Sequence, residues 1–350
     1  MSDLPPVAVT IVTFNSAKYI RRCLDLVLDQ DYARLSVVVV DNSSSDDTLE
    51  QVRAVHAGIT VIANDRNIGF AAGQNQAITA AGEFKWVLVL NPDVRLTRTF
   101  VSDLVDAGQR DADVGTVCGK LLAMGEDFLI PAQAAFDSTG IYMTPNLRHL
   151  DRGSKLPDKG QFDSAEYVFG ATGAAALFRE AMIRDISIDG EFFDSDFFAY
   201  REDADVAWRA QLLGWKCLYV PQAVAYHVRS VLPSNRKSVP AIVNMHSVKN
   251  RFLLRIKNTT PGLYSRFWLP ITLRDCAVIA GCLVGEWRSV PAFWFVLRHL
   301  RQTFRKRAAI MPKRRVSEDY ICGWFSVQPV SLPICANRRE SSAVKTQPSS

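Results

Sequence analysis

Three carboxylates stand within four positions of the chain, at Glu202, Asp203 and Asp205, and a good helix pattern follows them. Ionised carboxylates this close repel one another, so the cluster either complements the positive end of a helix or supplies a base and ligands for chemistry. A second acidic segment lies far upstream, where Asp93 follows the apolar run 86–90. Because open α/β sheets bind ligands beside the carboxyl ends of their strands, the two segments are expected to converge on one ligand.

The elements that must position these carboxylates alternate along the chain. β-branched and apolar runs predict buried strands, and amphipathic segments joined by short polar loops predict helices between them. This alternation predicts an α/β domain with a doubly wound sheet. The predicted strands are 7–14, 35–40, 59–63 and 86–90, and the helices are 18–30, 48–56 and one that ends near Gly82.

The second half of this domain surrounds the acidic cluster. A helix is predicted from Glu202 to Leu213, and Gly214 ends it as glycine often does. Short strands are expected at 215–220 and 224–228, the second of which contains His227. Residues 123–165 are rich in Gly, Pro and Asp with little periodicity, so they predict a long connection with short hairpins over the active face.

The net charge of +5 conceals a strong asymmetry between the two parts of the chain. Residues 231–350 carry 20 Lys and Arg against 5 Asp and Glu, whereas residues 1–230 carry 21 against 31. The basic part also holds many Trp, Phe, Leu and Val residues, which favours an anionic membrane surface over nucleic acid as its partner. A helical appendage packed on the core, with a solvated basic face, is the alternative. We expect a catalytic domain at 1–230, a basic amphipathic helical region at 231–311 and a partly disordered tail at 312–350.

Five segments in a fixed order resemble family 2 of the inverting nucleotide-sugar glycosyltransferases, over roughly residues 6–230. Each segment is weak evidence alone, but five in this order at compatible spacing form a strong signal. The third and fourth look most like the rhamnosyltransferase-type branch, whose members often build bacterial surface polysaccharides on lipid carriers. The five segments are 9–15, 40–44, 67–75, 91–93 and 200–205.

The resemblance implies a glycosyltransferase-A-type (Rossmann-like) mixed central sheet with helices on both faces, followed by a C-terminal helical appendage. It also implies a nucleotide-diphospho-sugar donor and Mg²⁺ or Mn²⁺. The family's metal motif is commonly Asp-x-Asp, but Asn91 stands first here, so only Asp93 offers a carboxylate. A hard cation bound mainly by diphosphate oxygens and water can accept a single protein carboxylate. By resemblance to relatives, His227 is a further metal ligand; an ordinary strand histidine is the alternative.

The resemblance also assigns roles to individual residues. Asp203 is expected to be the general base that takes the proton of the acceptor hydroxyl, with Glu202 as the second candidate. Asp205 and Arg209 are expected on the acceptor side. For Asn67, Gly73 and Asn75, ordinary helix–sheet packing is the alternative to donor binding. The predicted donor-binding residues are Thr13, Asn15, Asp41, Asn67, Gly73, Asn75, Asn91 and Asp93.

Together these features predict an enzyme that moves a single sugar, with L-rhamnose from dTDP-rhamnose as the first choice, to a lipid-linked or cell-surface glycan. No Gln-x-x-Arg-Trp motif of processive synthases is present. A sugar nucleotidyltransferase would need a Gly-rich phosphate loop after the first strand, and 13–16 is not one. A non-catalytic saccharide-binding scaffold is the other alternative. Because the N-terminus shows no signal-peptide pattern, we expect a cytoplasmic enzyme bound peripherally to the inner face of the plasma membrane.

Overall fold

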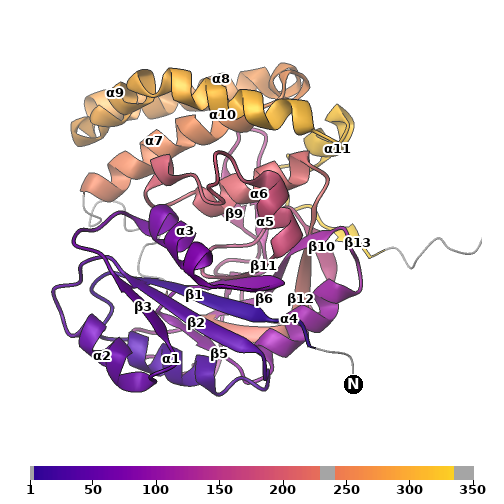
Figure 1. Ribbon diagram of the computed structural model, residues 1–350. Coiled ribbons are helices and arrows are strands. Elements are labelled where there is room, and N and C mark those ends of the chain that lie inside the picture. Colours follow the sequence, from indigo (N-terminus) through magenta and orange to yellow (C-terminus); the bar gives the residue numbers. More distant parts are fainter. Residues whose placement is uncertain (1–3, 229–240, 335–350) are drawn as a thin grey trace, which may run out of the picture.

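The computed structural model describes residues 4–228 and 241–334. Its centre is a mixed sheet with helices on both faces, and a layer of C-terminal helices covers one side (Figure 1). This is the sheet arrangement that the sequence predicted. The order of the main strands is β13-β10-β12-β6-β11-β4-β1-β2-β3.

The N-terminal half of the sheet is parallel and supplies three of the strand ends that form the site. The strands β1 and β4, and most of β2, are buried because β-branched and apolar side chains cover both of their faces, whereas the edge strand β3 is partly exposed. Strand pairing places the ends of β1, β2 and β4 at one edge, with Thr13 opposite Asp41. The strands are β1 (Val7–Thr13), β2 (Leu35–Asp41), β3 (Thr60–Ala63) and β4 (Trp86–Leu90), and the helices are α1 (Ile20–Leu28), α2 (Thr48–Val55) and α3 (Phe70–Ala80).

The second half of the sheet mixes strand directions. The strand β11 runs antiparallel to both β4 and β6, while β12 runs parallel to β6. The two short strands predicted at 215–220 and 224–228 are one strand, β12, with a register shift between Val220 and Val224. The strands are β5 (Val94–Leu96), β6 (Val114–Ala123), β7 (Phe136–Ser138), β10 (Glu166–Val168), β11 (Ala175–Arg179), β12 (Lys216–His227) and β13 (Leu332–Pro333).

Two hydrophobic cores lie on the two faces of the sheet. One contains α1 and α4 (Phe100–Gln109), and the other contains α3, α5 (Glu180–Ile186) and α6 (Glu202–Leu212). The long connection after β6 carries the predicted hairpin pieces, since β8 (Ile141–Met143) pairs with β9 (His149–Asp151). The helices therefore hold the sheet from both sides and leave the strand ends to form a site.

The C-terminal region is a layer of helices packed above α3 and α6 (Figure 1). Its first helix begins at residue 241 in the described chain, within the predicted helical region 231–311. The described part of the predicted tail also packs, because Trp324 and Phe325 are buried against Phe169; the rest of that tail, from residue 335, lies outside the described residues. The helices are α7 (Ala241–Asn258), α8 (Pro261–Val284), α9 (Pro291–Arg298), α10 (Leu300–Ile310) and α11 (Glu318–Gly323).

Helix α8 has the length and composition of a membrane-crossing helix, and it is the one such helix in the part of the chain that the structure describes. The most apolar 18-residue window of α8 has a mean hydropathy of 1.6 and is 11% buried in the protein. The helix contains Pro270 and is kinked at Phe267. Length and composition alone do not separate a spanning helix from one that lies on a surface.

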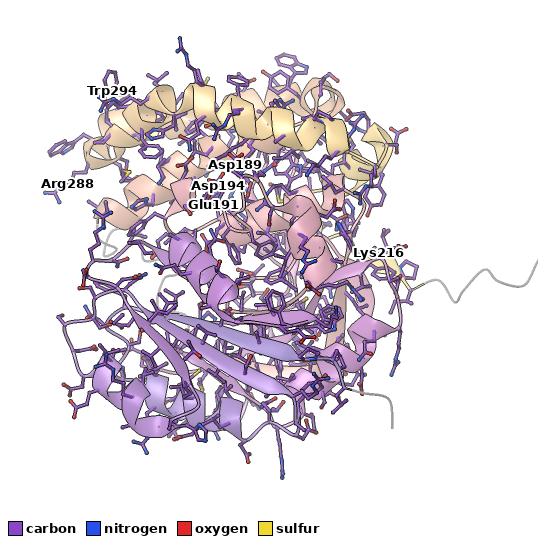
Figure 2. The ribbon with its side chains drawn as sticks, in the orientation of Figure 1. Asp189, Glu191, Asp194, Lys216, Arg288 and Trp294 are labelled. Carbon is purple, nitrogen blue, oxygen red and sulfur yellow. The ribbon has the colours of Figure 1, made fainter. Side chains whose placement is uncertain are left out.

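Buried ion pairs join the helical layer to the α/β domain. Lys257 of α7 donates hydrogen bonds to Asp194 and, at 2.9 Å, to Asp205. Lys306 of α10 donates to Asp194 at 2.5 Å and to Asp196 at 2.7 Å. Figure 2 shows Asp194 between the two layers. Because these charges are almost completely buried, the helical layer is bonded into the catalytic domain rather than loosely attached to it.

We expect Lys257→Ala to lower the free energy of unfolding by about 3–5 kcal/mol, because it removes one of the two cations that pair with each of the buried carboxylates Asp194 and Asp205. Urea unfolding at neutral pH measures this loss. Arg305→Gln is the matched control, since Arg305 pairs with Asp189 at the surface of the same helical layer. Exposed pairs contribute about 0–1 kcal/mol, so a Lys257 variant as stable as the control would contradict the role of these ion pairs.

Candidate active site at the carboxyl edge of the sheet

Asp41 forms one end of the site and is held in place by its neighbours. Its Oδ1 accepts hydrogen bonds from Thr13 Oγ1 at 2.8 Å and from Ser44 Oγ at 2.6 Å, and its Oδ2 accepts from the Ser44 amide at 2.9 Å. Asn15 adopts a positive φ of 51° and accepts a hydrogen bond from the Ser45 amide at 2.8 Å. The structure therefore brings the predicted residues Thr13, Asn15 and Asp41 together, with the carboxylate fixed before any ligand arrives.

Three other predicted donor residues hold α3 in position. Asn67 Oδ1 accepts a hydrogen bond from the Gly69 amide at 2.8 Å. A Cβ at Gly73 would lie 3.0 Å from the methyl groups of Val12, so this glycine permits close packing of the helix on β1. The side-chain amide of Asn75 donates a hydrogen bond to the carbonyl oxygen of Phe193 at 2.7 Å and accepts one from the backbone amide of Phe193 at 3.0 Å. Asn67 and Asn75 therefore bond to the protein's own backbone and Gly73 packs against β1, which agrees with the packing alternative. Contacts of these three residues with the nucleotide-sugar donor stay a prediction.

Asp93 and His227 meet because β5 pairs with the end of β12. The register places His227 opposite Val94, and the two side chains approach to 3.4 Å between Asp93 Oδ1 and His227 Nε2. Asn91, at the end of β4, donates its backbone amide to Ala174 at 2.8 Å, which fixes the turn that carries Asp93. The two predicted metal ligands are therefore adjacent at the sheet's edge.

Asp137 completes this group, and it was not predicted from the sequence. Its Oδ2 lies 2.8 Å from His227 Nδ1, and its side chain is buried. Burial opposes the positive charge of His227, but the bonds with Asp137 and Asp93 outweigh it and raise the His227 pKa to about 10. Many metal-binding histidines donate one ring N–H to a carboxylate, which is the position of Asp137 beside His227. To bind a metal ion through Nε2, His227 must release the proton that faces Asp93.

This donor set fits a divalent cation that the substrate helps to bind. Asp93 Oδ1 is buried and, apart from the long 3.4 Å approach of His227 Nε2, has no hydrogen-bond partner among the described residues, so it retains an acceptor position. A cluster of three or more protein ligands is absent from the part of the chain that the structure describes. One carboxylate and one imidazole, completed by diphosphate oxygens and water, is a coordination that Mg²⁺ or Mn²⁺ accepts.

The acidic helix α6 presents two carboxyl groups in different environments. Asp203 Oδ2 accepts a hydrogen bond from the Gly173 amide at 3.2 Å, and its Oδ1 accepts from the Ala204 amide at 2.7 Å. Burial raises the pKa of Asp203, while these amides favour its charged form. Glu202 is buried with Oε2 unbonded among the described residues, and burial and the neighbouring carboxylate of Asp203 raise its pKa to about 8. At neutral pH the protonated form of Glu202 is therefore favoured.

A strained turn directly before helix α6 sets the position of its first residues. Phe198, Tyr200 and Arg201 have φ values of 65°, 72° and 73°, in a region that non-glycine residues rarely adopt. Asn250 of α7 holds the turn by donating to the carbonyl oxygens of Phe197, Ala199 and Tyr200 at 2.7–2.8 Å. Such strain persists only where the surroundings impose it, and it is frequent at active sites. Asn250 is thus a positioning residue that no sequence motif indicated.

Asp205 and Arg209 lie in the interior, which corrects their expected acceptor-side placement. Both are at most 1% exposed, and they pair with each other at 2.9 Å. Asn258 donates to Asp205 at 2.7 Å, and Arg209 donates to the carbonyl oxygens of Ile186 and Phe192. The reason is helix geometry: residues two positions apart point to opposite sides, so Asp203 faces the site and Asp205 faces α7.

The raised pKa of Glu202 predicts a pH-dependent stability. A carboxyl group that holds its proton in the folded state stabilises the fold fully below its unfolded pKa of about 4.5, and this contribution is lost as the pH rises toward 8. We expect Glu202→Gln to gain at least about 1 kcal/mol over the wild type between pH 5 and 8 in urea unfolding. Glu50→Gln, in the exposed first turn of α2, is the control and should show no such gain. If the free energy of unfolding changes with pH in the same way in the wild type and in Glu202→Gln, Glu202 is ionised in the folded protein and the prediction is wrong.

The sequence profile described as "Glycosyl transferase family 2" matches residues 8–186, which spans all of these strand ends except β12. The chain belongs to glycosyltransferase family 2. It is therefore an enzyme of the glycosyltransferase class rather than a sugar nucleotidyltransferase or a scaffold. The predicted family is confirmed.

Two curated relatives illustrate the range of the family. The chain is 24% identical over 246 residues to the N-acetylglucosaminyl-diphospho-decaprenol L-rhamnosyltransferase of Mycobacterium tuberculosis, covering 65% of this chain and 76% of the relative. It is 21% identical over 228 residues to the poly-beta-1,6-N-acetyl-D-glucosamine synthase of Staphylococcus aureus, covering 65% of this chain and 50% of the relative.

Solved structures confirm the glycosyltransferase-A-type fold. GalNAc-T7 with UDP, GalNAc and Mn²⁺ superposes with a TM-score of 0.58 at 13% identity, covering 73% of this chain and 48% of that one. S. aureus TarS 1-349 in complex with UDP-GlcNAc superposes with a TM-score of 0.53 at 15% identity, covering 94% of this chain and 99% of that one. At these identities the likeness concerns the fold.

Proposed function

We propose that the chain transfers a single sugar, with inversion, from a nucleotide-diphosphate donor to a lipid-linked glycan acceptor. The observation that carries this proposal is the convergence of Asp41, Asp93 with His227, and Asp203 at one edge of the sheet. L-rhamnose from dTDP-rhamnose is the preferred donor, because the mycobacterial relative is named as an L-rhamnosyltransferase that acts on a diphospho-decaprenol acceptor.

Each group has a role in the proposed reaction. Asp41, held by Thr13 and Ser44, binds the nucleoside, and Asn15 closes the same end. Asp93 and His227 hold a divalent cation, which would neutralise charge on the departing diphosphate. Asp203 accepts the proton of the acceptor hydroxyl as that oxygen attacks the anomeric carbon. Protonated Glu202 adds no second negative charge beside this base.

Donor binding tests the proposal without requiring the acceptor. We would titrate dTDP-rhamnose, UDP-GlcNAc, UDP-galactose and GDP-mannose into the protein with and without Mn²⁺ and follow thermal unfolding. A donor at a hundredfold its Kd should stabilise the fold by about 2.7 kcal/mol. One donor that stands out, and only with metal, would support the proposal and identify the sugar. A folded protein that binds none of the four would contradict it.

The helical layer is proposed to lie on an anionic membrane at the cytoplasmic face. Large apolar side chains are exposed along α8 and the helices that follow it, and Figure 2 shows Trp294 and Arg288 at the same outer edge of this layer. Arg298 lies over the Trp294 ring at 5.5 Å, and Arg288 over the Trp287 ring at 5.8 Å. Aromatic and basic side chains together suit the headgroup region. The most exposed large apolar residues of this layer are Leu273, Leu283, Val284, Trp287, Trp294 and Leu297.

We expect the double variant Trp287→Ser, Trp294→Ser to lose most of its co-sedimentation with phosphatidylglycerol vesicles, because it removes the two most exposed tryptophans of the layer. Val327→Ser is the matched control, since Val327 is 74% exposed but lies outside the helical layer. Wild-type binding should fall with added salt. A double variant that sediments like the wild type would contradict the membrane assignment.

A further inference from the structure

A group of buried arginines lies where α7 meets α8. Arg255 of α7 forms an ion pair with Asp275 of α8, and Arg251 Nε lies 3.7 Å from the same carboxylate. Arg274, next to Asp275 on α8, and Arg201 are close enough to repel the charge of Arg251. Asp275 is the one carboxylate paired with Arg251 or Arg255 in the described chain, so within this arginine cluster (Arg201, Arg251, Arg255 and Arg274) those two buried guanidinium groups share a single negative charge.

Arg251 has hydrogen-bonding capacity that the described protein does not use. Its side chain is 5% exposed, yet neither Nε nor Nη2 has a hydrogen-bond partner among the described residues. Burial, with the neighbouring guanidinium groups, lowers the pKa of Arg251 to about 9. A buried guanidinium with unbonded donors is costly unless an anion satisfies it. The two unbonded donors of Arg251 therefore indicate an anionic ligand beyond Asp275.

The arginine cluster lies beside the catalytic segment. Asn250, the residue before Arg251, holds the turn that leads into α6, and Arg201 directly precedes Glu202 and Asp203. The cluster reaches the surface at Asp275, whose side chain is 25% exposed. Ile279, one turn after Asp275 on the same face of α8, is 39% exposed. A ligand here would meet arginine donors on one side and exposed apolar side chains on the other.

We propose that the arginine cluster binds the diphosphate of a lipid-linked acceptor and thereby presents its sugar to Asp203. This inference rests on the proposed function and names the acceptor class for that site. Guanidinium groups match phosphate oxygens through paired hydrogen bonds, and they are less strongly hydrated than lysine ammonium groups. The apolar surface of α8 beside the cluster suits the hydrocarbon chain that follows such a diphosphate.

Farnesyl diphosphate is the probe for this site, compared with inorganic diphosphate and farnesol. Binding to the full chain is followed by tryptophan fluorescence in EDTA, which prevents metal-dependent binding at the donor site. We expect farnesyl diphosphate to bind more tightly than either fragment. Arg251→Gln should weaken this binding about tenfold or more, because a charge-assisted hydrogen bond is lost. Arg301→Gln, an exposed arginine on α10, is the control and should bind like the wild type.

Asp275→Asn provides the opposite test, and it remains informative if Arg251→Gln does not fold. Removing the competing carboxylate should tighten farnesyl diphosphate binding, whereas a purely structural ion pair predicts lower stability with no tighter binding. Unchanged binding in both variants, or equal binding of inorganic diphosphate, would overturn the inference. If these shifts occur but no sugar is transferred, the proposed function fails and the anion site stands. If transfer occurs with the KM for a diphosphate acceptor unchanged in Arg251→Gln, the inference alone fails.

Discussion

Replacing Asp203 by Asn is expected to lower kcat by about 10²–10⁴-fold, the range that a positioned general base contributes. The amide oxygen of Asn can still accept one of the two backbone hydrogen bonds that Asp203 receives from Gly173 and Ala204, so the fold and donor binding should be largely preserved. What is lost is a group that can take the proton of the acceptor hydroxyl. Steady-state kinetics at saturating donor measures the effect, with donor-induced thermal stabilisation as the check on binding.

Glu202→Gln is the comparison variant for this result. A glutamate that is already protonated at neutral pH is imitated by glutamine, so kcat should stay within about tenfold of the wild type. If instead Glu202→Gln loses activity and Asp203→Asn keeps it, the two carboxyl groups have exchanged roles. If both variants keep wild-type activity, α6 does not supply the base.

Asp93→Ala is expected to abolish the metal-dependent part of donor binding and to lower kcat/KM by at least about 100-fold. Removing a partner outside the ligand shell typically reduces metal affinity or activity 10–100-fold, and a ligand should matter more. Asp93 is the single carboxylate ligand in the proposed site, because Asn91 occupies the other position of the usual motif. The variant should show the same thermal stability with the nucleotide whether or not Mn²⁺ is added.

Asp137→Asn distinguishes the role of the proposed metal ligand His227 from that of the carboxylate that orients it. Since Asp137 acts through His227 Nδ1, we expect an intermediate loss of about 10–100-fold with some metal dependence retained. Asp31→Ala, an exposed aspartate, is the control for the loss of a negative charge. Mn²⁺-dependent nucleotide binding in Asp93→Ala as strong as in the wild type would exclude Asp93 as a ligand.

The sequence predicted the parallel half of the sheet well, because β1, β2 and β4 are continuous apolar runs followed by polar strand ends. Asp93 follows directly from this pattern, whereas Asp41 was assigned by the family resemblance. The sequence pattern could not identify residues that contact the site from distant, irregular segments of the chain. Asp137 reaches His227 through the pairing of β7 with β6 and of β6 with β12, which no local pattern encodes.

The C-terminal region differed most from expectation for a physical reason. Charged residues at helical spacing read as a solvated basic face, yet Lys257 and Arg251 are buried because α7 lies between α6 and the outer helices. Their counter-charges, Asp194 and Asp205 for Lys257, belong to segments far away in the sequence. Conversely, the opposite orientations of Asp203 and Asp205 were readable from helical periodicity alone.

The most direct test of the central claim is the anomeric configuration of the transferred sugar. The full chain would be incubated with Mn²⁺, the donor selected by the binding titration and a lipid-diphosphate-linked N-acetylglucosamine acceptor, and the product examined by NMR. We predict one sugar per acceptor, with the configuration opposite to that of the donor, and no product with Asp203→Asn. Retention of configuration, or equal product from Asp203→Asn, would contradict the account.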